Sequence, residues 1–100
     1  MKHYKKESDF QADVIKMVEN RFPGCYCVKQ ETRQGTPDLL VLHQKHWAML
    51  ENKIDENAEH QPNQDWYVDH FNDMSFAAFV YPSNVEEVLN EMERSFQDCR

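Results

Sequence analysis

Two short polar motifs border neighbouring apolar runs of the 100-residue sequence. Pro37-Asp38 opens the first run, and Glu51-Asn52-Lys53 closes the second run after a short turn. If the two runs pair as antiparallel strands, Asp38 lies close to Glu51. Two adjacent carboxylates repel each other unless a proton or a cation lies between them, and Mg²⁺ prefers oxygen ligands of this kind. With the Lys53 ammonium beside it, the pair predicts a divalent-metal site that acts on a phosphate group.

Three polar residues on otherwise apolar helical stripes indicate what surrounds this pair. Glu7 and Gln11 extend backward the apolar stripe of a helix expected over about 8–22. Gln64 occupies the first step of the apolar stripe of a helix expected to begin at Pro62. A common position near the two carboxylates would explain why both stripes contain polar groups.

The other elements follow from periodicity and from turn residues. Strands are expected at 25–28, 39–42, 47–51 and 76–81, and helices at 8–22, from residue 62 onward and at 85–96. The apolar 39–42 run predicts a strand that is covered on both faces. Alternation places Glu51 and Lys53 on one face of their strand and Asn52 on the other. Ser83 and Glu86 predict a capping box at the last helix. Its glutamates should face solvent, namely Glu86, Glu87, Glu91 and Glu93.

Length and composition indicate one packed domain, which we expect to span residues 1–100. Forty per cent of the residues are hydrophobic and only two are glycine, which favours a folded chain over a disordered one. No apolar run approaches the roughly 20 residues of a membrane span, and no signal-peptide core follows the N-terminus. We therefore expect a soluble, cytoplasmic protein. Three cysteines without framework spacing argue against a disulfide scaffold.

The net charge of −7 is unusual for a protein that binds nucleic acid. Residues 1–53 carry nine Lys and Arg against seven Asp and Glu, whereas residues 54–100 carry two against eleven. The acidic excess belongs to the second half, and the predicted metal site lies in the first. The average charge therefore says little about the site itself.

Taken together, the motifs resemble the virus-type replication-repair nuclease (VRR-NUC) branch of the PD-(D/E)XK nuclease superfamily. That branch has an E-x-x-x-Q at its first helix, a G-x-PD, an ExK and a Gln in the following helix. The matching positions are Glu7 and Gln11, Gly35 to Asp38, Glu51 to Lys53, and Gln64. The resemblance covers most of the chain, from Glu7 to the strand that ends at Tyr81. It implies a small mixed β-sheet flanked by helices, the restriction-endonuclease-like core of phage-type stand-alone domains.

The resemblance also implies a division of roles among these residues. Asp38, Glu51 and the main-chain carbonyl of Asn52 would bind Mg²⁺ or Mn²⁺, and Glu7 would complete the site directly or through water. Lys53 would serve the attacking water, Gln64 would support the site or contact the phosphate, and Gln11 would have a supporting role. The implied activity is endonucleolytic hydrolysis of DNA by a metal-bound water. Stand-alone members often act as homodimers on branched DNA, such as junctions or flaps, in a bacterial cell or a phage-infected host.

A second interpretation remains open because the loop after Lys53 is acidic at Asp55, Glu56 and Glu59. The chain could be an inactive nuclease-fold module that binds a protein, or that mimics DNA, through its acidic second half. A pure binding module has no physical need for the adjacent charges of the motif, which favours the enzyme. A plain salt-bridge cluster ranks last. The candidate phosphate contacts are Lys29, Arg33 and Lys45.

Two other groups of residues have less specific patterns. His43 and His46 could be combined on paper with Cys25 and Cys27 into a zinc site, but the spacing fits no finger. Trp47 and Trp66 could stack on nucleic-acid bases, yet their strand and helix spacing predicts that both lie in the core.

Overall fold

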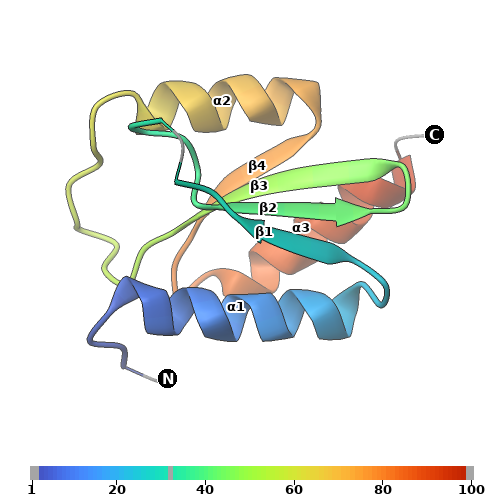
Figure 1. Cartoon of the computed structure of the whole chain (residues 1–100), viewed down its shortest axis with the longest axis horizontal. Helices are drawn as coiled ribbons and strands as arrows, with labels where there is room; N and C mark the ends of the chain where they lie inside the picture. The colour runs from blue at the N-terminus through green and yellow to red at the C-terminus, as the bar shows by residue number, and fades with distance from the viewer. Residues whose placement is uncertain (1–2, 32, 99–100) are drawn as a thin grey trace.

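The chain folds into three helices and four strands in the predicted order, α-β-β-β-α-β-α (Figure 1). The computed structural model describes residues 3–31 and 33–98. The helices are α1 (Glu7–Arg21), α2 (Gln64–Met74) and α3 (Val85–Asp98). The strands are β1 (Tyr26–Lys29), β2 (Leu39–His43), β3 (His46–Asn52) and β4 (Phe76–Val80). Within the described ranges, no helix is both long and apolar enough to cross a membrane.

The four strands form one mixed sheet in the order β1-β2-β3-β4. The β1–β2 and β2–β3 pairs are antiparallel, and the β3–β4 pair is parallel. A two-residue turn joins β2 to β3, and Gln44 in this turn adopts a φ of 58°, a conformation that Asn or Gly usually supplies. The parallel pair requires a crossover, which contains α2. As a result, the carboxyl ends of β3 and β4 lie at the same edge of the sheet.

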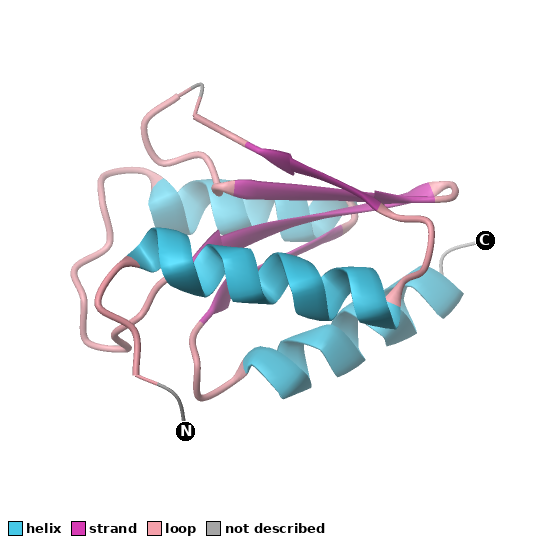
Figure 2. Ribbon diagram, turned by 60° about the horizontal axis from the view of Figure 1, so that its bottom comes forward, coloured by secondary structure: helices cyan, strands magenta, loops and turns pink. Residues whose placement is uncertain are grey.

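The helices cover the two faces of the sheet unequally: α1 and α3 lie on one face and α2 on the other (Figures 1 and 2). Along β2, Leu39 and Val41 enter the larger core beneath α1 and α3. Leu40 packs with Met49 in the smaller core beneath α2. Burying a side chain of this kind contributes roughly 1.5–3 kcal/mol. Because α2 packs on β3 and β4, the far end of β2 is uncovered and Leu42 is 41% exposed. The prediction that β2 is covered on both faces is therefore wrong at this end.

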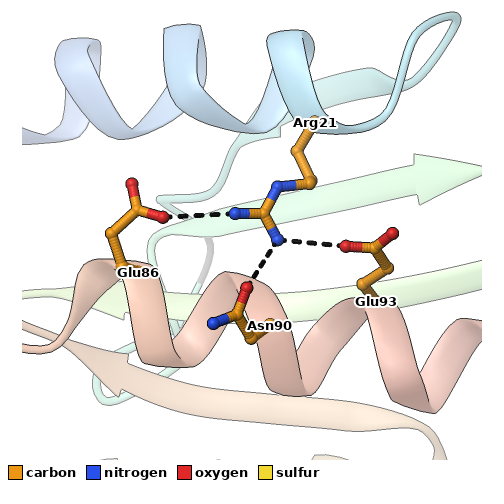
Figure 3. A network of polar contacts seen from close by, with 4 residues as sticks. All are labelled: Arg21, Glu86, Asn90 and Glu93. Carbon is orange, nitrogen blue, oxygen red and sulfur yellow. Dashed lines mark hydrogen bonds and ion pairs between the residues drawn. The ribbon is translucent and has the colours of Figure 1, made fainter.

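One arginine ties the end of α1 to α3 (Figure 3). Arg21 Nη1 donates to Asn90 Oδ1 at 2.9 Å and to Glu93 Oε1 at 3.0 Å, while Nη2 donates to Glu86 Oε2 at 3.2 Å. Glu86 and Glu93 were predicted to face solvent, and their side chains remain 74% and 44% exposed while they bind this guanidinium. Arg21 lies at the opposite end of α1 from Glu7, so these contacts stabilise the fold away from the predicted site.

Two predicted helix starts differ from the structure. The helix α2 begins at Gln64 rather than at Pro62, because Asn63 at the N-cap adopts a left-handed φ of 73°. Ser83 does not cap α3: its hydroxyl donates to Glu56, and the helix begins one residue too late for a capping box. Loop contacts of this kind, between residues distant in sequence, leave no periodic signal.

Candidate active site

Asp38 directly precedes β2, and Glu51 lies at the end of β3. These two strand ends lie at the edge of the sheet where α1 and α2 begin (Figure 1). The register pairs Leu39 with Leu50, so the two carboxylates occupy adjacent positions on the neighbouring strands. The antiparallel pairing predicted for these two segments is confirmed. One short hairpin thus brings together two acidic residues that are separated by twelve residues in the sequence.

Asp38 is held by hydrogen bonds to both its side chain and its main chain. Asn52 donates to Asp38 Oδ1 twice, from its main-chain N–H at 3.1 Å and from Nδ2 at 2.9 Å. The main-chain carbonyl of Asp38 accepts from Gln11 Nε2 at 3.1 Å and from the Gln30 N–H at 2.9 Å. Both side-chain bonds fall on Oδ1, which leaves Oδ2 for an outside group. Alternation predicted that Asn52 would point away from Glu51, but its amide reaches Asp38 at the end of the strand.

Glu51 is oriented from the opposite side of the site by the first residue of α2. Gln64 Nε2 donates to Glu51 Oε2 at 3.2 Å, and Gln64 Oε1 accepts from the Gln61 N–H at 2.8 Å. The amide nitrogen of Gln64 donates and its oxygen accepts, so the two hydrogen bonds together define which end of the amide is the oxygen. Glu51 and Lys53 are each only 5% exposed. Two charged side chains are thus largely withdrawn from water at one place.

Partial burial changes the pKa values of the two carboxyl groups, Asp38 and Glu51. Burial raises the pKa of Asp38 to about 6, although the two Asn52 hydrogen bonds act in the opposite direction. Burial, and then the charge of Asp38, raise the pKa of Glu51 to about 8, while the Lys53 ammonium lowers it. The charge of Glu7 raises the pKa of both carboxyls. At neutral pH the site therefore favours a bound proton, or another positive charge, between the carboxylates.

The oxygen atoms at this place fit a hard divalent cation. Asn52 Oδ1 is buried and has no hydrogen-bond partner, on the same amide whose Nδ2 binds Asp38. Among residues 3–31 and 33–98, no three His, Cys, Asp or Glu side chains lie close enough to enclose a metal by themselves. Mg²⁺ is commonly held by one or two carboxylates together with waters and substrate phosphates, a pattern that the Asp38 and Glu51 pair matches.

Comparison with known proteins agrees with this geometry. Neither the family models nor the curated proteins contain a match. A solved structure described as a VRR_NUC domain matches with a TM-score of 0.55 and 29% sequence identity, over 79% of this chain and 92% of that one. The chain belongs to the VRR-NUC family. Its fold is accordingly that of a nuclease-type domain.

In the structure of this chain, Glu7 lies at the rim of the site rather than between the two carboxylates. Glu7 is the first residue of α1, and its side chain is exposed. It lines one hollow together with Lys29 and Asp38. Glu7 is thus close enough to act on the site electrostatically, and a contact through water fits its position.

The three basic residues predicted to contact phosphate do not lie together. Lys29 pairs with Leu39 in the sheet and so lies next to Asp38. Arg33 is exposed in the loop that leads to the site. Lys45 lies in the turn between β2 and β3, at the far end of β2 from Asp38. A five-residue strand spans about 17 Å, so Lys45 is separated from the candidate site by the length of β2.

A glycine in the loop before β2 allows that loop to touch the start of α2. Gly35 has a φ of 89°, and a Cβ at this position would lie 2.6 Å from the main-chain oxygen of Pro62. The glycine of the G-x-PD motif therefore serves a close backbone approach. This contact holds the segment that carries Asp38 against the segment that carries Gln64.

Sequence reasoning missed a cluster beside Glu51 on the β4 side. The His60 ring stacks on Phe79 with 4.2 Å between centroids, and its Nδ1 lies 2.8 Å from Asp65. His60 Nε2 lies 3.3 Å from the Tyr81 hydroxyl. Phe79 is the register partner of Glu51 in β4. No local pattern in the sequence links His60 to a strand that begins sixteen residues later.

The zinc and tryptophan predictions have different outcomes. Within the described part of the chain His43 and His46 belong to no cluster of metal-binding side chains, and both rings pack near Phe96. Trp47 is half-buried against Phe71. Trp66 is 58% exposed, so the prediction that it lies in the core is wrong.

Proposed function

We propose that this VRR-NUC domain is a metal-dependent endonuclease that hydrolyses phosphodiester bonds of DNA. The observation that carries the proposal is the pair formed by half-buried Asp38 and buried Glu51, two carboxyls that raise each other's demand for positive charge at one edge of a nuclease-type fold. In a purely structural cluster, neighbouring opposite charges normally balance one another. Here the pKa of Glu51 stays raised even with the Lys53 ammonium beside it, so a further positive charge would stabilise the two carboxylates.

Asp38, Glu51 and the main-chain carbonyl of Asn52 would hold Mg²⁺ or Mn²⁺, with Glu7 acting from the rim. The bound cation would supply Lewis acidity and would neutralise the charge of the phosphoryl oxygens. Asn52 and Gln64 orient the carboxylates through the bonds at 2.9 Å and 3.2 Å described above. Ligands fixed in advance by other side chains need no rearrangement when the substrate arrives.

Lys53 would act on the reacting groups themselves. A water oxygen attacks phosphorus in line with the leaving oxygen, the P–O bond breaks, and the proton of the water passes to the surroundings. The Lys53 ammonium offsets the charge that develops on the phosphoryl group and orients the water. Its side chain is 5% exposed, so solvent screens this charge less than it would on the surface.

A small acidic domain of this kind suits branched DNA, such as a junction or a flap, better than a long duplex. Few basic residues surround the site, so it cannot cover many phosphates. Two symmetric cuts require two sites, and a homodimer provides them. The proposal therefore includes a homodimer that acts on branched DNA.

The test is nicking of supercoiled and branched DNA with Mg²⁺ or Mn²⁺, and with EDTA as the metal-free control. Glu51→Gln and Lys53→Ala should each reduce the rate by at least about 100-fold. Glu87→Gln changes the net charge as Glu51→Gln does, at an exposed position of α3, and should leave the rate unchanged. Cleavage that survives both site substitutions would overturn the assignment.

The alternative, an inactive binding module, draws on the acidic side chains of α2, since Asp65, Asp69 and Asp73 are all exposed. A thermal melt separates the two functions. A metal site predicts that Mn²⁺ raises the melting temperature of the wild type more than that of Asp38→Asn. Equal melting temperatures with and without Mn²⁺ in both proteins would favour the binding module.

A further inference from the structure

Tyr81 follows β4 at the place where Lys53 follows β3. The two strands are parallel with Glu51 opposite Phe79, and the Lys53 N–H donates to the Val80 carbonyl at 2.9 Å. Because side chains alternate along a strand, Tyr81 shares a face with Phe79. By the same rule Lys53 shares a face with Glu51, and both of these faces are turned toward α2. Lys53, which would orient the attacking water, therefore has the Tyr81 ring as its neighbour.

A histidine connects the Tyr81 hydroxyl to α2. His60 stacks on Phe79, and its Nε2 lies 3.3 Å from the Tyr81 hydroxyl while its Nδ1 lies 2.8 Å from Asp65 Oδ1. A carboxylate can only accept a hydrogen bond, so Nδ1 carries the ring proton. In the neutral ring Nε2 is then an acceptor for the Tyr81 O–H. The order carboxylate, imidazole and hydroxyl is that of a catalytic triad, with a phenol in place of the serine.

The first turn of α2 orients both this histidine and the candidate metal ligand. Gln64 binds Glu51, and the next residue, Asp65, binds His60. The side chains that fix these two groups are therefore neighbours in one helical turn. Groups that are held in advance in this way need no rearrangement when the substrate arrives.

The charges around the Tyr81 hydroxyl suit a group that passes a proton on. Burial, followed by the charges of Asp65, Glu56 and Glu51, raises the pKa of Tyr81. The phenol is thus held in its neutral form, and its hydroxyl lies close enough to Glu51 to sense the charge of the candidate site. The Asp65 carboxylate offsets the positive charge that His60 acquires when it accepts a proton.

We propose that Tyr81 takes the proton of the attacking water and passes its own proton to His60. This inference rests on the proposed nuclease function and names the proton acceptor of that reaction. As the water oxygen bonds to phosphorus and the bond to the leaving oxygen breaks, one water proton moves to the Tyr81 oxygen and the Tyr81 proton moves to Nε2 of His60. The leaving oxygen takes a proton from solvent, and His60, whose side chain is 27% exposed, returns its proton to solvent. Tyr81 is the catalytic residue of this relay, and His60 and Asp65 are positioning residues that act through it.

The kinetic experiment is nicking of supercoiled DNA with Mn²⁺. Tyr81→Phe keeps the ring and removes only the hydroxyl, so it should lower kcat by about 100-fold and leave KM unchanged. His60→Ala should lower kcat by a similar factor, and imidazole in the buffer should restore part of the rate because it can occupy the space of the missing ring. Imidazole should not restore Tyr81→Phe, which lacks the connecting hydroxyl. The matched control is His70→Ala, which removes an exposed histidine of α2 and should have no effect.

A second measurement needs neither metal nor substrate. NMR of the ring nitrogens in the metal-free protein should show the His60 proton on Nδ1, with Nε2 as the acceptor. A proton on Nε2 instead would make His60 a donor to Tyr81 and would overturn the relay.

Three kinetic results would also overturn the relay: full activity of Tyr81→Phe, a loss that appears in KM rather than in kcat, or no rescue of His60→Ala by imidazole. The last would leave His60 a structural role in packing on Phe79. A wild type that cleaves no DNA with Mg²⁺ or Mn²⁺ would refute the nuclease proposal and the relay together. An active wild type beside an equally active Tyr81→Phe would refute the relay alone.

Discussion

Replacing the Glu51 carboxylate by an amide should stabilise the metal-free protein at neutral and alkaline pH, although it should abolish activity. The folded-state pKa of Glu51 is raised to about 8 from an ordinary value of 4.5. A raised folded-state pKa means that the folded protein holds the proton more tightly than the unfolded chain does. The associated stability is complete below about pH 4.5 and is lost as the pH rises toward 8.

The size of the effect follows from the same pKa. Each pH unit between the two values costs about 1.4 kcal/mol of unfolding free energy. From pH 5 to pH 7 the full effect would be about 3 kcal/mol, and screening by water at the open side of the site reduces our expectation to about 2 kcal/mol. Glu51→Gln removes the ionisation and keeps an oxygen that can accept from Gln64, so the variant should lose this pH dependence.

The assay is thermal unfolding in EDTA across pH 5–8 for the wild type, Glu51→Gln and the exposed control Glu87→Gln. At pH 7 the Glu51→Gln variant should melt about 8–16 °C above the wild type, because 1 kcal/mol corresponds to about 4–8 °C in a domain of this size. The difference should shrink toward pH 5, and Mn²⁺ should raise the melting temperature of the wild type. Parallel curves for the wild type and Glu51→Gln from pH 5 to pH 8 would refute the reasoning.

Other substitutions test the contacts that hold the site and the fold. Gly35→Ala should lower the unfolding free energy, measured in urea, by about 1–3 kcal/mol. The reason is that φ is positive at this position and the new Cβ would lie 2.6 Å from the Pro62 oxygen. An unchanged urea midpoint would contradict this. Asn52→Ala should reduce the rise in melting temperature caused by Mn²⁺, since Asp38 loses its 2.9 Å bond, and a full rise would show that the main-chain N–H suffices. Arg21→Ala should cost about 1 kcal/mol in urea unfolding and leave the Mn²⁺ effect intact; a smaller Mn²⁺ effect would mean that this distant contact influences the site.

Local patterns were enough to predict the elements and their order, and they were less informative about which faces are covered. Leu42 and Trp66 show the reason. Helical or strand spacing tells which residues share a side, but not whether a neighbouring element reaches that side. Because α2 packs on β3 and β4, the end of β2 and one flank of α2 are left open.

Residue type and spacing also placed the main groups of the candidate site together. The polar interruptions at Gln11 and Gln64 were expected near the carboxylates, and the structure places their amides on the Asp38 carbonyl and on Glu51. The Asn52 amide and His60 could not be predicted in the same way. Their positions depend on how the ends of the strands and the following loop bend back, which periodicity does not describe.

The location of Asp38 and Glu51 on one hairpin has a consequence for the order of folding. The hairpin closes a short loop, whereas Gln11 and Gln64 reach the pair only after α1 and α2 have docked. The two negative charges therefore meet before the amides that orient them arrive, and their repulsion opposes an early step. We expect Mg²⁺ to accelerate refolding in stopped-flow experiments. If Mg²⁺ slows only unfolding, the carboxylates come together after the rate-limiting step.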